Sequence, residues 1–152
     1  SLVRDLPDGA DDIDRADAFS RIETNTYRLF WDYAAGNPAV ALHFWGESLK
    51  YDAAGKCVVH LFKPPDTKDI EQLPDEAIFV LRAVVQLDLA SKRDIAAATL
   101  LSLAQVGDAL RYAHSRGWVE TSGSRYQVAW RWFRAITNVL ERRHLLVTKD
   151  VR

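Results

Sequence analysis

The sequence predicts a mainly α-helical protein with small β elements, in which a helical hairpin is followed by a second helical domain carrying a β-hairpin. Apolar residues recur at the 3.6-residue period of helices through most of the chain. The period changes to that of strands only in two short stretches, 51–63 and 118–129. The pair Pro64-Pro65 lies between the halves and can continue neither a helix nor a sheet. We therefore expect the chain to divide there.

Composition sets the class of protein. The 152 residues are 48% hydrophobic and 27% charged, which is typical of one folded domain or two small ones. No apolar run approaches the roughly 18 residues of a membrane span, so none is expected. The N-terminus does not resemble a signal peptide, which predicts a cytoplasmic location. A single cysteine excludes internal disulfides, and the lack of methionine in a chain that starts Ser-Leu predicts a piece of a longer protein.

Three parts are expected along the chain: an acidic connector over 1–17, a helical subdomain with a small β-hairpin over 18–65, and a second domain over 66–152. Residues 1–120 hold 13 Lys/Arg and 19 Asp/Glu, whereas 121–152 hold 7 and 2. This distribution excludes a uniformly basic nucleic-acid binder but leaves room for a basic C-terminal face.

The helical subdomain is predicted to start with a helix over residues 19–35. Its stripe at helical spacing consists of Ile22, Thr26, Leu29, Phe30 and Tyr33. Gly36-Asn37-Pro38 ends this helix and starts another, because glycine suits the position after a helix, asparagine the N-cap and proline the first helical position. The second helix should run to about residue 49. The residues spaced to face a neighbouring element are Ala41, Leu42, Trp45, Ser48 and Leu49.

A small β-hairpin is expected next. Residues 52–55 (Asp-Ala-Ala-Gly) are typical of a turn, residues 57–62 form a strand candidate, and Tyr51 pairs across the turn. Because Cys57 stands in an apolar strand pattern, we expect it in the core. The five tryptophans are also expected mainly in the core between the two halves, with some of the aromatic residues exposed where the missing part of the longer protein would cover them.

Three helices should open the second domain. The first begins at Pro74, the second at Ser91, and the third runs from Ser102 to Arg116-Gly117. Their expected core positions are Ile78, Leu81, Val84, Val85, Ile95, Ala98, Val106, Leu110 and Ala113.

A β-hairpin and a last helix complete the predicted domain. Residues 118–120 and 126–129 are the strands, with a turn at 122–124. The last helix starts at about Arg131 and should bury Ile136, Val139 and Leu140.

The order of elements over residues 74–130 resembles a winged helix-turn-helix domain. Ser91–Ala98 resembles the first helix of the turn motif, the helix from Ser102 the recognition helix, and Gly117-Trp118-Val119 the start of the wing. In such domains the recognition helix enters the major groove of DNA. The DNA-contacting residues expected from this resemblance are Lys92, Arg93, Gln105, Arg111 and Arg125.

The charges of the predicted recognition helix limit DNA reading. Its outward residues are expected to be Gln105, Asp108, Arg111, Tyr112 and Ser115. Base edges would be contacted by Gln105 and Arg111, and DNA phosphates by Lys92, Arg93 and Arg125. Asp108, in the middle of this face, would be repelled by phosphate. So few contacts predict weak, salt-sensitive binding.

Residues 35–42 (A-G-N-P-A-V-A-L) are similar to the G-x-P-x-A-L element in the helical lid of AAA+ and STAND-type ATPases. In those families a lid is commonly followed by a winged helix. The resemblance implies that the subdomain is lid-like and that Pro38, with Asn37 beside it, lies against bound ATP. Many AAA+ relatives place a sensor arginine directly after this proline, whereas this chain has Ala39. The resemblance therefore does not extend to phosphate sensing.

No catalytic or metal-binding pattern accompanies these motifs. The sequence lacks the phosphate-loop motif G-x-x-x-x-G-K-[ST], and its four histidines have no ligand spacing. The carboxylates of residues 1–17 lack the spacing of a calcium loop. We therefore expect no enzyme activity, no catalytic residue, no metal and no cofactor in this chain, and ATP only in the parent protein.

Two functions fit these patterns. The first is a non-catalytic C-terminal regulatory fragment of a P-loop ATPase, whose lid closes over nucleotide held by an ATPase core in the same chain. Its winged helix would couple the nucleotide state to a protein client or to DNA. The alternative is a MarR-like DNA-binding transcription regulator, with residues 18–63 as a dimerisation or effector element. Both functions are compatible with an oligomer.

Overall fold

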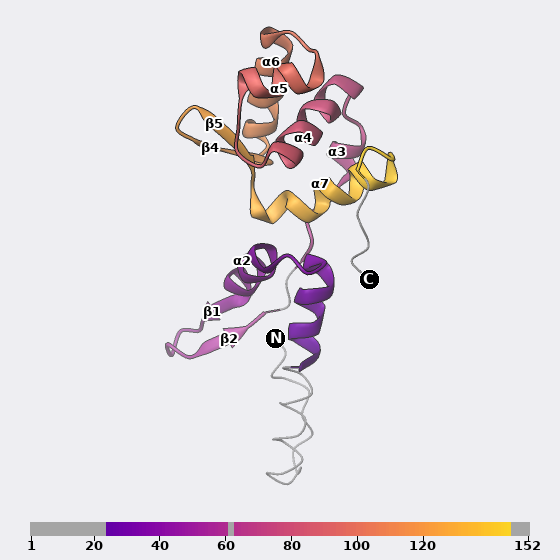
Figure 1. The fold of residues 1–152 in the computed structure, drawn as a ribbon. Helices are drawn as coiled ribbons and strands as arrows, with labels where there is room; N and C mark the ends of the chain where they lie inside the picture. Colours follow the sequence, from indigo (N-terminus) through magenta and orange to yellow (C-terminus); the bar gives the residue numbers. More distant parts are fainter. Residues whose placement is uncertain (1–23, 61–62, 147–152) are drawn as a thin grey trace, which may run out of the picture. The chain divides into compact units, whose positions relative to one another are not determined.

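The computed structural model describes residues 24–60 and 63–146 of a chain that divides into two compact units, 1–63 and 64–152 (Figure 1). The fold is mainly α-helical with small antiparallel sheets, as the sequence predicts. We call residues 24–60 the hairpin unit and residues 64–146 the winged-helix unit. The predicted acidic connector lies outside the described residues.

The hairpin unit contains two helices and a two-stranded sheet. A first helix covers residues 24–34 and is followed by α2 (Pro38–Ser48), β1 (Leu49–Tyr51) and β2 (Cys57–Val59). The strands pair antiparallel, with Leu49 opposite Val59 and Tyr51 opposite Cys57. The predicted helical hairpin and the pairing of Tyr51 across the turn are therefore confirmed.

The junction between the helices forms as the local signals predict. Gly36 has a positive φ of 78°, which glycine adopts without steric cost. The Asn37 side chain caps α2 by accepting hydrogen bonds from the N–H groups of Ala39 and Val40, at 3.0 and 3.3 Å. Pro38 occupies the first helical turn, where its missing N–H costs no hydrogen bond.

The buried face of the hairpin unit differs from the predicted one. Thr26 and Phe30 are buried as expected, but Leu29 is 43% exposed and Leu42 is 69% exposed. The buried positions of α2 are Val40, Phe44 and Ser48. The helix is apolar on several sides, so periodicity alone placed the stripe incorrectly at Leu42, while Ser48 was placed correctly.

Cys57 is exposed, and its predicted core position is wrong. It lies at the turn end of the β1–β2 ladder opposite Tyr51, which is 77% exposed. No other strand of the described residues pairs with this ladder to cover it.

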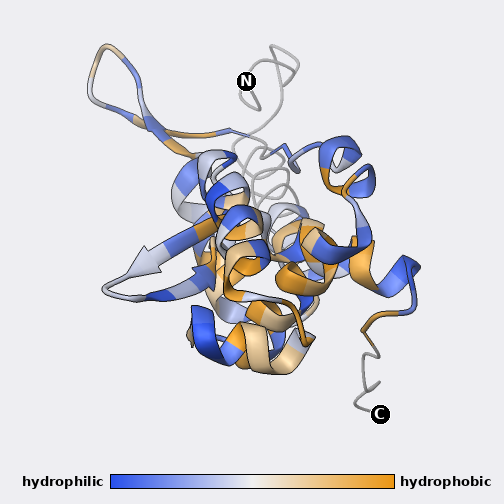
Figure 2. Cartoon of the chain, turned by 90° about the horizontal axis from the view of Figure 1, so that it is seen from above, coloured by the Kyte–Doolittle hydropathy of each residue, from blue (hydrophilic) through white to orange (hydrophobic). Residues whose placement is uncertain are grey.

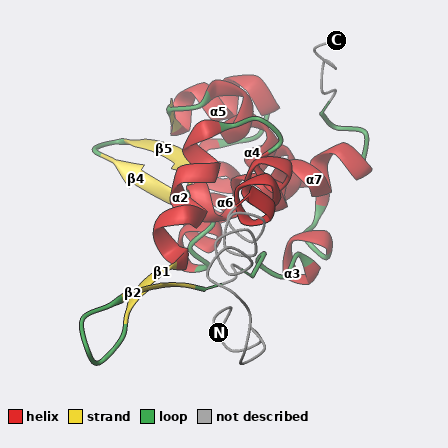
Figure 3. Ribbon diagram, turned by 90° about the horizontal axis from the view of Figure 1, so that it is seen from below, coloured by secondary structure: helices red, strands yellow, loops and turns green. Residues whose placement is uncertain are grey.

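The winged-helix unit consists of five helices and three strands among the described residues. In chain order they are α3 (Lys68–Glu71), α4 (Asp75–Leu87), β3 (Ala90–Ser91), α5 (Lys92–Thr99), α6 (Leu103–Ser115), β4 (Val119–Ser122), β5 (Arg125–Val128) and α7 (Trp130–Arg142). The sequence did not predict α3 or β3. Strand β5 lies between β3 and β4, and both pairings are antiparallel. Figure 3 shows β4 and β5 as a hairpin that extends from the helices.

Serine caps start the two helices of the turn motif. Ser91 and Asp94 bond each other's backbone N–H groups at the start of α5, and Ser102 and Gln105 do so at the start of α6. Each capping box satisfies amide groups that a helix start leaves without partners. The two helices therefore start where the sequence predicts.

One apolar core fills the winged-helix unit. Figure 2 shows its apolar residues gathered on the inner sides of the helices, whereas the β4–β5 hairpin is mostly hydrophilic. Val106, Leu110 and Ala113 of α6 are each at most 3% exposed, as predicted. Ala98 is exposed, contrary to the prediction, because Ile95 and Ala96 supply the core contacts of the short helix α5.

Candidate functional site

Asn37 and Pro38, the two predicted nucleotide contacts, lie at the start of α2. Pro38 is exposed and Asn37 is half-buried. The Asn37 side-chain oxygen already accepts bonds from Ala39 and Val40, so these N–H groups are not available to a phosphate while the cap is intact. The geometry is that of a helix cap with an adjacent exposed proline.

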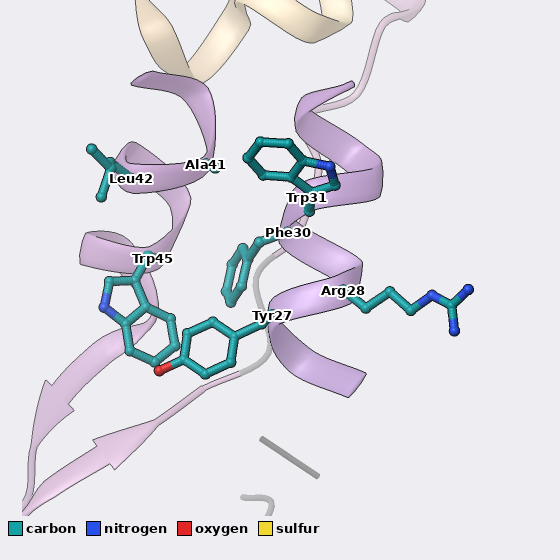
Figure 4. A pocket seen from close by; sticks show the side chains of 7 residues that line it. All are labelled: Tyr27, Arg28, Phe30, Trp31, Ala41, Leu42 and Trp45. Atoms are coloured by element: carbon teal, nitrogen blue, oxygen red, sulfur yellow. The ribbon is translucent and has the colours of Figure 1, made fainter. Parts of the chain in front are cut away.

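An apolar groove begins one turn after this cap, between the first helix and α2 (Figure 4). It has a volume of about 530 Å³, and its rings pack on one another: the Tyr27 and Phe30 centroids lie 4.9 and 5.7 Å from that of Trp45. Tyr27, Trp31 and Leu42 are 48%, 56% and 69% exposed. Its one charged lining residue, Arg28, points away from the rings in Figure 4. These exposed apolar side chains gather on one face of the helix pair, which makes the groove the candidate binding surface of the hairpin unit.

Sequence reasoning did not locate this groove. The expectation that tryptophans are mainly core holds for Trp118, which is 1% exposed, but not for Trp31 and Trp130, which are 56% and 37% exposed. Both helices of the hairpin unit are rich in aromatic residues, which is the sequence signal for the groove. Which of these residues are exposed depends on which helix faces pack together.

The five predicted DNA-contacting residues are exposed in the winged-helix unit, but three of them are engaged within the unit. Gln105 accepts hydrogen bonds from the backbone and side chain of Ser102, at 3.0 and 2.9 Å. An Arg111 nitrogen lies 3.2 Å from an Asp108 carboxylate oxygen. Arg125 donates a hydrogen bond to the carbonyl of Leu89 at 3.2 Å.

Lys92 and Arg93 start α5 and have no ion pair among the described residues, yet a carboxylate stands beside them. The pKa of Asp94 lies below its usual range because Ser91 donates side-chain and backbone hydrogen bonds to it and Arg125 is nearby. Asp94 is therefore ionised at neutral pH and offsets part of the positive charge.

The exposed side of α6 carries no net charge in its middle. Asp108 and Arg111 pair on it, while the neighbouring Tyr112 rests edge-on against Trp118 at a centroid distance of 5.7 Å. A DNA-reading helix needs positive charge on this side to attract phosphate. Asp108 was predicted to weaken DNA binding by repelling phosphate. In the structure it instead forms an ion pair with Arg111, the arginine that was expected to contact DNA.

Within residues 24–60 and 63–146, no group of His, Cys, Asp and Glu side chains has a metal-binding arrangement. No helix in the described part of the chain is long and apolar enough to cross a membrane. No family model, no curated protein and no solved structure matches the chain.

Proposed function

We propose that this chain is a non-catalytic regulatory region of a P-loop ATPase, with the hairpin unit as the lid and the winged-helix unit as the module that meets a protein partner. The apolar groove carries the proposal. It starts one turn after Asn37-Pro38. In this proposal the end of α2 that faces the nucleotide and the face that docks on the core therefore belong to the same helix. A lid that packs on an ATPase core requires such a face.

The proposal assigns no hydrolysis to the chain itself. ATP is held by the core, the exposed Pro38 contacts one side of it, and the cap of Asn37 keeps the start of α2 rigid. The lid moves as a body when nucleotide binds, and the winged helix transmits this movement.

The complete coding sequence around this chain provides the first test, and a phosphate-loop motif in it is expected. The second test places a photo-crosslinking residue at position 42 of that complete polypeptide, with position 51 as the control. Leu42 and Tyr51 are both highly exposed, but only Leu42 lines the groove. ATP-dependent cross-linking from position 42 to the nucleotide-binding core is expected. A coding sequence without the motif, or equal cross-linking from both positions, contradicts the proposal.

The MarR-like alternative is favoured by the antiparallel wing and by the exposed Lys92 and Arg93. Anisotropy of labelled duplex DNA against salt distinguishes it. If Arg111 contacts a phosphate together with Lys92, Arg93 and Arg125, about four phosphate contacts give a slope of log affinity on log salt near −3.5, which means weak binding at physiological salt. Asp108→Asn should strengthen this binding and Arg111→Ala should weaken it. Nanomolar sequence-specific binding by the chain would establish the alternative.

A further inference from the structure

A second groove lies within the winged-helix unit, between α3, the start of α4 and one side of α6. Its volume is about 530 Å³, and it is lined by an apolar floor and an acidic rim. We call its apolar lining residues Leu73, Pro74, Ala77 and Ala109 the floor and its carboxylates Asp69, Glu76 and Asp108 the rim; Gln72, Gln105 and Tyr112 complete the lining. The lining contains no Lys, Arg or His.

The walls of this groove are fixed by the core beneath it. Ile70 of α3 is fully buried, Leu73 is 9% exposed, and Val106 anchors the same stretch of α6 from below. Grooves whose walls belong to a packed core are largely formed before a ligand arrives. A partner therefore needs little rearrangement of the unit to bind.

The rim keeps its negative character although two of its carboxylates are paired. Asp69 pairs with Arg116, and Asp108 pairs with Arg111 at 3.2 Å, but neither arginine lines the groove. Glu76 is exposed in the first turn of α4 and has no ion-pair partner among the described residues. The groove thus combines apolar lining residues with one carboxylate that has no ion-pair partner among the described residues, Glu76, and two that each have a single arginine partner outside the lining.

We propose that this groove binds a segment of a partner protein in which basic side chains flank an apolar one. The apolar side chain fills the floor, and Lys or Arg on either side meets Glu76 and Asp108. Complementary charge selects this occupant, because the lining offers three carboxylates and no basic group, and Glu76, which has no ion-pair partner in the described part of the chain, favours a basic side chain over an acidic one. The inference rests on the proposed function, since it names the kind of partner that the winged-helix unit receives.

The test uses the whole 152-residue chain and a labelled synthetic peptide with two lysines on each side of a Leu-Leu pair. A matched peptide carries glutamates in place of the lysines. Anisotropy titrations should show binding of the lysine peptide that weakens as salt rises, and no binding of the glutamate peptide. In NMR titrations the amide signals of Ala77, Ala109 and Tyr112 should move.

Substitutions separate the groove from general attraction to an acidic protein. Glu76→Gln and Asp108→Asn should each weaken binding about two- to five-fold, as expected for loss of one exposed ion pair. Glu120→Gln is the control, because Glu120 is exposed on β4, outside the groove, and the change in net charge is the same. Ala109→Arg should abolish binding by filling the floor with positive charge, and its circular dichroism must match that of the parent chain.

Equal loss in Glu120→Gln and Glu76→Gln would overturn the inference, as would equal binding of both peptides or NMR changes outside the groove. If Ala109→Arg does not fold, the two rim variants and the NMR map still decide. The experiment involves neither nucleotide nor DNA, so it can fail while the tests of the lid and of DNA binding succeed.

Discussion

The hairpin unit and the winged-helix unit are built from the same parts, capped helices and an antiparallel hairpin, but they cover their apolar side chains differently. In the winged-helix unit a single cluster of buried residues extends from Ile70 to Leu140. In the hairpin unit Phe30, Ala34, Val40 and Phe44 are buried, while Trp31 and Leu42 are more than half exposed. Similar local structure therefore leaves the winged-helix unit with a large closed core, although its Leu100 and Leu103 are 92% and 54% exposed, and the hairpin unit with an apolar groove that is open to solvent.

This difference separates folding from binding. A helix that buries its apolar side within its own unit gains stability from it, whereas a helix that exposes its apolar side gains this stability only when another surface covers it. The winged-helix unit is expected to fold by itself and to bind through charge. The hairpin unit is expected to bind through apolar contact.

Removing the same side chain from each unit gives the largest expected contrast. Leu110 is 1% exposed in α6, so Leu110→Ala should lower the free energy of unfolding of the winged-helix unit by about 2–5 kcal/mol. Leu42 is 69% exposed in α2, so Leu42→Ala should change that of the hairpin unit by about 0.5 kcal/mol or less. Urea titrations followed by NMR signals of each unit measure both. Similar losses in the two variants would mean that the groove is covered within the chain.

Loss of one helix cap in each unit should have a smaller and similar effect. Asn37→Ala and Ser102→Ala each remove a side-chain acceptor for backbone N–H groups at a helix start. Each should cost its own unit about 1 kcal/mol of unfolding free energy. The same urea titrations apply, with Asn37→Asp as the control that keeps the cap. An unchanged hairpin unit in Asn37→Ala would show that Asn37 does not act as a cap.

The smallest expected effect is a pH dependence of the winged-helix unit. Hydrogen bonds from Ser91 lower the pKa of Asp94 in the folded state, so its contribution to stability is complete above the usual carboxyl range. The contribution is lost as the pH falls through the lowered folded-state pKa. Asp94→Asn should therefore be less stable than the parent chain at neutral pH and approach it in acid. A difference that stays constant with pH would contradict this origin.

Local signals predicted the helix boundaries well. Gly36-Asn37-Pro38, Ser91 and Ser102 act through their own backbone and nearest neighbours, so the sequence contains the whole cause. Strand β3 consists of two residues that are extended because they pair with β5, about 35 positions later in the chain. No local sequence pattern predicts this strand.

The candidate sites were only partly predictable. The exposure of Gln105 and Arg111 followed from the helical period, and Lys92, Arg93 and Arg125 were placed at a helix start and in the wing. The pairing of Arg111 with Asp108 and the bond from Arg125 to Leu89 depend on the folded geometry. The exposed position of Leu42 depends on which side of α2 meets the first helix. Both grooves arise from elements brought together by packing, so sequence spacing did not reveal them.

Hydrogen exchange of the complete polypeptide, with and without ATP, tests most directly the claim that the hairpin unit is a lid. Mass spectrometry would compare amide protection in residues 24–48 and in α6. The account predicts that ATP increases protection of residues 24–48, because the groove is covered on closure, and leaves α6 unchanged. The 152-residue chain alone should show no ATP effect. Unchanged protection of residues 24–48 in the complete polypeptide, or an equal ATP effect in the chain alone, would contradict the account.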